Sequence, residues 1–343
     1  MRSPTNWLAV SLLVALVAGN HGIAKQADPL PSQSMEVLAT DPLFASDGVH
    51  CNAALSDWSR SDQPYCFHSS RSINTDINTQ GGIIFFLHIP KTGGTTLRLN
   101  LERYDHINYI FAKNYSIYSD TASLVEDAIL NGTSNKTVLF YEIHASTAPS
   151  FYQLRHRLRR WKDIATKNGV PTFFFTLLRD PIAYAFSHFN FFHVQRRNPT
   201  FEQCNATLDN FLRLTLFNPQ CHFLFQGEWA MRAQKPKNKV LTTQECHVVQ
   251  DYMLQLLDWI GTTERLSNDT LPLLSRLLNL PENHTWINHK VSKTAQGVNY
   301  FGKENVTEAV LEWIKHDMSL MDTGLYQMAG DCYRYDAVYE TES

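Results

Sequence analysis

The segment that decides the fold is Ile83-Ile-Phe-Phe-Leu-His-Ile-Pro-Lys-Thr-Gly-Gly-Thr-Thr96. Its first part, residues 83–89, is a continuous apolar run interrupted only by His88, which is typical of a strand buried on both faces of a parallel sheet. After the loop that starts at Pro90, the apolar residues Leu97, Leu99 and Leu101 alternate with polar ones and indicate a helix. The segment therefore predicts a strand, a loop and a helix in succession.

This loop has the residues needed to hold a phosphate-like anion. Its glycines let the backbone approach a ligand closely, and successive N–H groups at a helix N-terminus form an anion cradle. A Walker loop places its lysine after the glycines, whereas here the lysine precedes them, so the loop departs from ATP and GTP binders. A glycine-containing turn with a solvated lysine is the alternative. The candidate anion ligands are Lys91, Thr92, Gly93, Gly94, Thr95 and Thr96.

The rest of the chain alternates apolar and amphipathic segments. Further strands are predicted at 137–143, at 173–178 and near 259–263, and helices at 149–168, after 181 and around 307–318. Gly169 marks the end of the helix at 149–168. Strands that alternate with helices predict an α/β fold, here a P-loop-like three-layer sandwich with a central parallel sheet and a largely helical C-terminal half. We assign this domain to residues 81–343.

The sequence Pro90-Lys-Thr-Gly-Gly-Thr-Thr96 after a buried strand resembles the 5′-phosphosulfate-binding loop of Golgi sulfotransferases that use 3′-phosphoadenosine-5′-phosphosulfate (PAPS). Among these, heparan sulfate 6-O- and 2-O-sulfotransferases are most similar. The resemblance extends over about residues 81–335, where 258–266 looks like a structural strand and turn of these relatives. It implies PAPS as the sulfuryl donor, adenosine 3′,5′-bisphosphate (PAP) as the product, and no metal.

A second anion site is predicted where another strand ends. Arg179 follows the strand at 173–178, and Ser187 lies eight residues further on. In the family, an Arg-Asp-Pro turn with a serine at this spacing binds the nucleotide 3′-phosphate, and a surface pair of Arg179 with Asp180 is the alternative. The resemblance also makes Lys290 and Lys293 candidates for the 3′-phosphate, although an ordinary solvated loop fits equally well.

The candidate general base is His144, which ends the strand predicted at 137–143. The 6-O-sulfotransferases carry a base histidine in a similar His-Ala context, and an imidazole titrates near working pH. A structural histidine is one alternative, and Glu142 is another candidate base. In the expected in-line displacement, His144 takes the proton of an acceptor hydroxyl while Lys91 stabilises charge on the departing phosphate oxygen. We expect activity in the presence of EDTA.

The acceptor is less well defined by the sequence. A basic segment after His144 puts Arg155, Arg159 and Lys162 on one predicted helix face, where they could steer a polyanionic glycan, or form an ordinary solvated face. We expect a carbohydrate acceptor, a glycosaminoglycan or other polysaccharide. The alternatives are a protein-tyrosine sulfotransferase and a non-catalytic lumenal protein that binds nucleotides or glycans.

The N-terminus predicts entry into the secretory pathway. Arg2 precedes a short apolar run at 7–19 followed by small residues, so residues 1–24 are a cleaved signal peptide or a short signal-anchor. The polar stretch 25–80 is predicted to be a stem or linker. We therefore expect location in the Golgi lumen, with or without a membrane anchor, or secretion. The formal net charge of −3 argues against a nucleic-acid partner.

Glycosylation and disulfide formation fit the same compartment. An even count of 6 cysteines without zinc-ligand spacing predicts disulfides, and Cys51–Cys66 is the pairing we favour because it would staple a polar segment that lacks a core. Triplets of the form Asn-x-Ser/Thr predict N-glycosylation at Asn114, Asn131, Asn135, Asn205, Asn268, Asn283 and Asn305.

Overall fold

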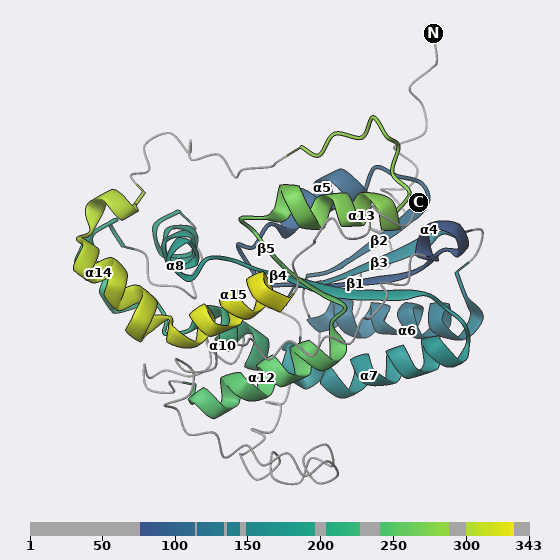
Figure 1. Cartoon of the computed structure of the whole chain (residues 1–343), viewed down its shortest axis with the longest axis horizontal. Helices are drawn as coiled ribbons and strands as arrows, with labels where there is room; N and C mark the ends of the chain where they lie inside the picture. The colour runs from purple at the N-terminus through teal and green to yellow at the C-terminus, as the bar shows by residue number, and fades with distance from the viewer. Residues whose placement is uncertain are drawn as a thin grey trace, which may run out of the picture. The chain divides into compact units, whose positions relative to one another are not determined.

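Five strands form a central parallel sheet in the computed structural model of the chain (Figure 1). The residues that the structure describes are 76–113, 115–133, 136–144, 149–195, 204–226, 241–287 and 300–332. The strand order is β2-β3-β1-β4-β5, and every pairing is parallel. The strands are β1 (Gly82–His88), β2 (Ile107–Ala112), β3 (Val138–His144), β4 (Thr172–Leu178) and β5 (Trp259–Thr262).

Helices cover both faces of this sheet, which confirms the predicted α/β sandwich (Figure 1). On one face lie α5 (Gly94–Leu101) and α13 (Leu271–Leu277), and on the other lie α6 (Tyr115–Asn131), α7 (Phe151–Lys167) and α12 (Thr243–Leu256). The first face packs on Phe86, Phe140 and Phe175. On the second, Trp161 of α7 lies edge-on to Phe85 and Tyr141. Alternate residues of each strand thus supply the two cores.

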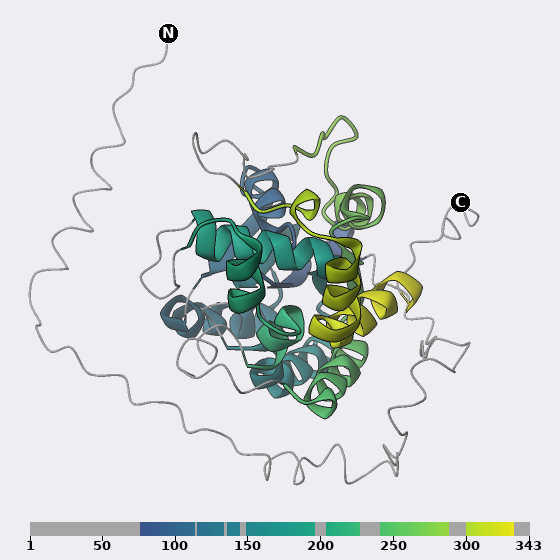
Figure 2. The ribbon, with the colours of Figure 1, turned by 90° about the vertical axis from the view of Figure 1, so that its left-hand side faces the viewer.

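The remaining helices gather beyond the C-terminal ends of the strands, as the views in Figures 1 and 2 show. Their own core joins Phe186, Phe189, Phe211 and Phe301 to the helices near the C-terminus. The C-terminal half of the described chain is largely helical, as predicted. These elements are α8 (Pro181–Phe189), the π-helical η3 (Asn190–Gln195), α9 (Leu208–Leu214), α10 (Pro219–Phe225), α14 (Glu308–Trp313), the π-helical η6 (Ile314–Met318) and α15 (Leu320–Cys332).

Local sequence explains where the long helix α7 begins and ends. Ser150 accepts a hydrogen bond from the Gln153 N–H, and the Gln153 side chain accepts one from the Ser150 N–H, which is a capping box. The helix ends before Gly169, whose φ of +66° is the left-handed conformation that glycine adopts without a side-chain clash. The predicted helix at 149–168 is thus confirmed to within two residues at its start and one at its end.

The described fold begins slightly before the predicted domain. The short helix α4 (Ile77–Gln80) places Ile77 in the core beneath α13, where 1% of it is exposed. The predicted signal segment and most of the predicted stem lie outside the described residues. No helix within those residues combines the length and the apolar character needed to cross a bilayer.

Candidate active site

The loop between β1 and α5 has an unusual backbone conformation. Lys91 has a φ of 72° and Gly93 a φ of 105°, both in the left-handed region. Gly93 is the N-cap of α5, so the N–H groups of Gly94 and Thr95 at the start of the helix have no intrahelical acceptor, whereas the Thr96 N–H donates to the Gly93 carbonyl at 2.9 Å. A Cβ added to Gly94 would come within 2.4 Å of the His88 ring. The loop therefore has a tight backbone geometry that is compatible with the predicted anion cradle, whose ligand binding stays a prediction.

Not every predicted ligand in the loop is equally available. The Thr92 hydroxyl donates a hydrogen bond to the Ile89 carbonyl at 2.8 Å, and Thr92 is fully buried. Thr92 therefore stabilises the turn itself, and it would have to give up this bond to donate to a phosphate. Thr96 is also buried, whereas Thr95 and Gly93 are half-buried at the loop surface.

Arg179, the candidate residue of the second anion site, contacts the loop between β1 and α5. Its Nη1 donates to the Lys91 carbonyl at 3.2 Å, and its Nε is buried without a hydrogen-bond partner among the described residues. Arg179 is half-buried, and a guanidinium with one buried, unsatisfied donor fits a site for an anion. The alternative pairing with Asp180 is wrong, because Asp180 instead caps α8 by accepting from the Ala183 N–H at 2.8 Å.

The Lys91 ammonium lies toward α8 and η3. Its Nζ is 4.1 Å from the centroid of the Phe191 ring, a cation–π geometry. Burial, followed by the charges of His193 and Lys91, lowers the pKa of His188 to about 3, so His188 is neutral at physiological pH. Ser187, the residue before it, is half-buried on α8. The other predicted ligands of the 3′-phosphate, Lys290 and Lys293, lie outside the described residues.

His144 ends β3 directly beside the end of β1, since His88 and His144 are partners in the parallel register. Their rings are perpendicular, with centroids 4.7 Å apart. The Phe111 ring of β2 lies edge-on to His144 at 5.9 Å. The candidate base therefore lies at the same sheet edge as Lys91 and Arg179, as the parallel topology predicted.

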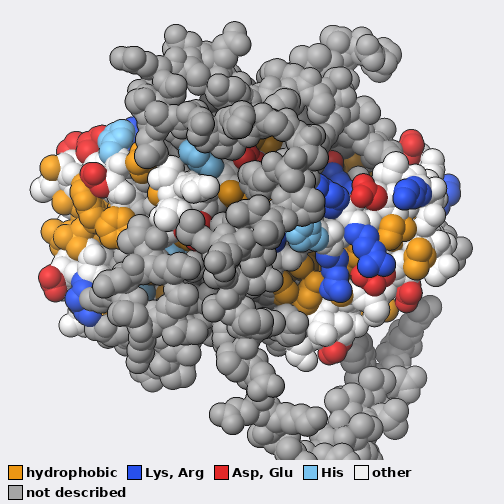
Figure 3. Space-filling view, turned by 90° about the horizontal axis from the view of Figure 1, so that it is seen from below, with side chains coloured by type: hydrophobic (Ala, Val, Ile, Leu, Met, Phe, Trp, Pro, Cys, Tyr) orange, Lys and Arg blue, Asp and Glu red, His pale blue; other side chains and the backbone are white. Residues whose placement is uncertain are grey.

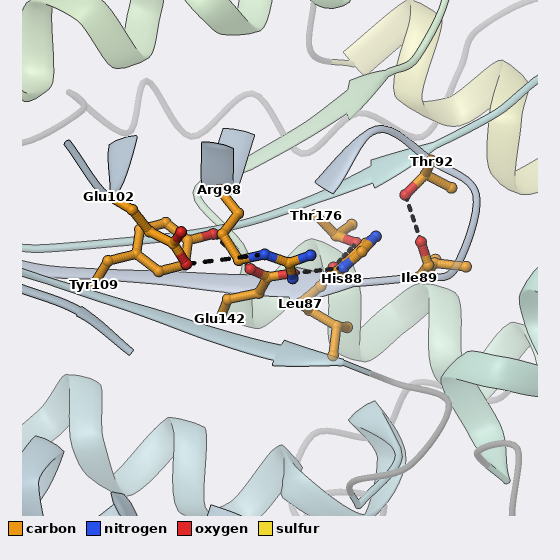
Figure 4. A network of polar contacts seen from close by, with 9 residues as sticks. All are labelled: Leu87, His88, Ile89, Thr92, Arg98, Glu102, Tyr109, Glu142 and Thr176. Atoms are coloured by element: carbon orange, nitrogen blue, oxygen red, sulfur yellow. Dashed lines mark hydrogen bonds and ion pairs between the residues drawn. The ribbon is translucent and has the colours of Figure 1, made fainter. Parts of the chain in front are cut away.

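Glu142 does not suit the role of alternative base. It shares the sheet face of His144, as strand alternation requires, but it is completely buried. Its carboxylate contacts the Nδ1 of His88 at 2.6 Å and accepts a hydrogen bond from the Tyr109 hydroxyl at 2.5 Å, and Arg98 Nη1 is 3.7 Å away (Figure 4). An acceptor hydroxyl cannot reach a carboxylate enclosed in this way.

The predicted glycan-steering residues make structural contacts instead. Arg155 is 5% exposed, with its guanidinium 3.8 Å from the centroid of the Tyr152 ring. Arg159 donates to Gln255 of α12 at 2.7 Å. Lys162 pairs with Asp258 at 2.6 Å, and the same aspartate accepts from the N–H of Phe174 near the start of β4. That end of the strand is opposite the edge where His144 lies, so Lys162 does not border the site.

The visible part of the lower side of the molecule carries charges of both signs. On the face seen in Figure 3, the Lys and Arg side chains are interspersed with Asp and Glu side chains. Acceptor binding by α7 stays a prediction.

Several residues that position the site were not predicted from the sequence. The side-chain amide of Gln220 of α10 makes two hydrogen bonds to the backbone of Arg179. Its Oε1 accepts from the Arg179 N–H and its Nε2 donates to the Arg179 carbonyl, both at 2.9 Å. Thr263, just after β5, donates to the carbonyls of Thr92 and Leu178. The only sequence feature that pointed to Thr263 was the resemblance of residues 258–266 to the sulfotransferase family. Gln220 follows a polar turn without a recognisable motif, so the sequence did not point to it.

The described sequon asparagines are all exposed, which leaves them accessible for glycosylation; they are Asn131, Asn205, Asn268, Asn283 and Asn305. Asn114 and Asn135 lie outside the described residues, as do Cys51 and Cys66. Among the residues that the structure describes, a disulfide joins Cys221 of α10 to Cys246 of α12. Within the described part of the chain, no group of three or more His, Cys, Asp or Glu could hold a metal ion.

Comparison with known proteins gives little further information. No protein-family model matches the chain, and no curated protein matches it. Among solved structures, the crystal structure of mouse sulfotransferase SULT7A1 complexed with PAP is similar, with 14% identity, a TM-score of 0.32, and coverage of 76% of this chain and 94% of that chain. We draw no functional conclusion from a similarity of this size.

Proposed function

We propose that this protein is a sulfotransferase that transfers the sulfuryl group of PAPS to a hydroxyl of a carbohydrate acceptor in the lumen of the secretory pathway. The observation that carries this proposal is the convergence of three elements at one sheet edge. The lysine-led diglycine loop, the Arg179 guanidinium 3.2 Å from the loop carbonyl, and His144 all follow the ends of adjacent parallel strands.

Each element has a separate role in the displacement. The loop N–H groups and Lys91 bind the 5′-phosphosulfate and stabilise the negative charge that develops on the phosphate oxygen. Arg179 and Ser187 bind the 3′-phosphate. His144 accepts the proton of the acceptor hydroxyl while the oxygen–sulfur bond to the acceptor forms and the bond from sulfur to the phosphate oxygen breaks. The products are the sulfated acceptor, PAP and a protonated His144, which then releases its proton to solvent.

Nucleotide binding is the first test of this proposal. The glycosylated protein should show a higher melting temperature with PAP than without ligand, and little change with ATP or GTP at the same concentration. Stabilisation by ATP or GTP but not by PAP would contradict the donor assignment.

The acceptor class is tested by transfer of labelled sulfate from PAPS. The panel comprises heparan sulfate, de-O-sulfated heparin, chondroitin and an acidic tyrosine-containing peptide. We expect incorporation into a glycan. Incorporation into the peptide alone would identify a tyrosine sulfotransferase, and incorporation into none despite PAP binding would identify a non-catalytic protein.

The role of His144 is tested by His144→Ala. We expect turnover to fall by about 100-fold or more, as for the loss of a general base. PAP affinity should change little, because the proposed nucleotide contacts come from the loop and Arg179. Unchanged turnover would contradict the role of His144 as the base.

A further inference from the structure

A buried pair of side chains connects the phosphate loop to the candidate base. The His88 ring lies against Gly94, where a Cβ would approach ring atoms to 2.4–2.5 Å. The same ring lies 4.7 Å from the His144 ring and perpendicular to it. Only 5% of His88 is exposed. It is therefore in contact with both the loop and the base, while remaining inaccessible to an acceptor hydroxyl.

The orientation of this ring is fixed from two directions. Phe86 stacks on it with an interplanar angle of 16° and a centroid distance of 5.4 Å. The carboxylate of Glu142 lies 2.6 Å from Nδ1. Because an ionised carboxylate can only accept hydrogen bonds, we assign the proton of this bond to Nδ1. The bond thereby selects one tautomer of His88 and one orientation of its ring.

The carboxylate itself is held in place by residues of two other elements. The Tyr109 hydroxyl of β2 donates to its second oxygen, and burial, followed by the charge of Glu142, raises the pKa of Tyr109 well above its usual range. Arg98 of α5 lies 3.7 Å from the carboxylate, and Glu102 lies 3.9 Å from the Nε of Arg98. These groups and His88 are the titratable side chains drawn with Glu142 in Figure 4, and His144 contacts the ring of His88.

We infer that His88, held by Glu142, is a positioning residue that orients the His144 ring and aligns it with the phosphate loop. This inference rests on the proposed sulfuryl transfer. When His144 takes the acceptor proton it gains a positive charge, and Glu142 places a negative charge one ring away from it. The arrangement follows the logic of a triad, in which a buried carboxylate orients an imidazole and stabilises its charged form. Here a second imidazole lies between them.

The test uses two substitutions that remove different parts of this connection. His88→Phe keeps a flat ring against Gly94 and Phe86 but loses the Nδ1–H. Glu142→Gln keeps a hydrogen-bond acceptor for Nδ1 but loses the charge. Tyr141→Phe is the control, because Tyr141 lies next to Glu142 on β3, faces the opposite side of the sheet and bonds to Thr121 at 2.9 Å.

We expect each of the two substitutions to lower kcat by about 10-fold or more with PAPS and the best acceptor of the panel above. PAP affinity should stay within about threefold of that of the unmodified protein, and the double variant should lose no more than the worse single variant, because the two residues act as a unit. In Glu142→Gln the acidic limb of the pH–rate profile should move to lower pH, because protonation of His144 loses a favourable charge. Tyr141→Phe should change none of these quantities.

Three results would overturn the inference. One is a kcat within about threefold of the control for both substitutions, and another is a fall in turnover that loss of PAP affinity explains fully. The third is a pH–rate profile that does not move in Glu142→Gln. If His88→Phe fails to fold, Glu142→Gln alone still tests the inference. An unmodified protein that neither binds PAP nor transfers sulfate would instead overturn the proposed function, and the inference with it.

Discussion

Lys91 combines a charged side chain with a backbone conformation that normally belongs to glycine. Its φ of 72° costs about 1–2 kcal/mol for a residue with a Cβ. The Arg179 guanidinium holds the carbonyl of the same residue, and Phe191 lies beneath its ammonium group. Strain of this kind persists where the surroundings determine the conformation, and it is frequent at functional sites. The backbone conformation does not favour lysine at this position, so the proposed function attributes the residue to its charge.

Two substitutions at Lys91 separate these effects. Lys91→Ala and Lys91→Gly both remove the ammonium group, and each should lower turnover by about 100-fold or more. Lys91→Gly should be the more stable variant by about 1 kcal/mol, because glycine adopts the positive φ without a clash. Turnover is measured with PAPS, and stability by urea unfolding. Turnover close to that of the unmodified protein in Lys91→Gly would show that the charge is not needed.

At the scale of elements, the packing of α5 on β1 depends on the missing side chain of Gly94. Substituting alanine for a helical glycine usually stabilises a helix by about 0.5–1 kcal/mol. Here the added Cβ would come within 2.4 Å of the His88 ring, which is itself held by Phe86 and Glu142. Steric overlap should therefore outweigh the helix propensity.

Gly94→Ala should destabilise the fold by about 1–3 kcal/mol and weaken PAP binding, because the start of α5 moves away from β1. Gly330→Ala is the matched control, since Gly330 lies in α15 and an added Cβ would meet nothing within 4 Å. This control should be neutral or slightly stabilising. Urea unfolding and PAP titration measure both effects, and equal stability of the two variants would contradict the close contact with His88.

The helix α10 links a distant carboxylate to the predicted nucleotide site. Asp322 of α15 is fully buried and accepts hydrogen bonds from the N–H groups of Gln220 at 2.9 Å and Cys221 at 2.8 Å. Gln220 in turn holds the backbone of Arg179. Burial raises the pKa of Asp322 from 3.8 to about 7, although these hydrogen bonds oppose the shift. The ionisation of Asp322 therefore affects stability in a physiological pH range.

Asp322 should make the protein less stable as the pH rises from about 4 to about 7. In that window the folded chain keeps the proton that the unfolded chain has released, so unfolding releases a proton and becomes easier with rising pH. Above about pH 7 both states are ionised and the contribution is constant. Asp322→Asn should remove this slope, whereas Asp209→Asn at an exposed position of α9 should keep it. Urea midpoints at about pH 5 and pH 7.5 test this, and an equal slope in Asp322→Asn would contradict it.

For the whole molecule, the sequence predicted those parts that depend on local pattern. The strands β1, β3 and β4 are continuous apolar runs, and parallel topology then places Lys91, His144 and Arg179 at one edge. The edge strand β2 was missed, because Asn108 is exposed and the three residues after it are only partly buried, so its pattern is mixed. Arg155 was expected at the surface, but its guanidinium is buried against an aromatic ring.

The contacts that complete the site were beyond prediction for a different reason. Gln220 and Asp322 act on residues 41 and about 100 positions away, and local periodicity carries no information about such pairings. The pairing of His88 with Glu142 also joins two strands, and each residue alone resembles an interruption of an apolar run. Sequence pattern thus identified the chemical groups, while the tertiary structure shows how they are held.

The disulfide between Cys221 and Cys246 connects the stability of the whole molecule to this site. It closes a chain segment with a sequence separation of 25 residues, so constraint of the unfolded chain predicts a stabilisation of about 3–4 kcal/mol. Cys221 is adjacent to Gln220, which holds Arg179. Replacing both cysteines by serine should therefore lower the free energy of unfolding by about 3–4 kcal/mol. The same variant should also bind PAP more weakly, because Gln220 would hold Arg179 less firmly. The control is the double variant Cys51→Ser/Cys66→Ser, in which the free energy of unfolding and PAP binding are measured in the same way. These two cysteines lie outside the described residues. A non-reducing peptide map that finds Cys221 and Cys246 as thiols, or a double variant that keeps full stability, would contradict this role.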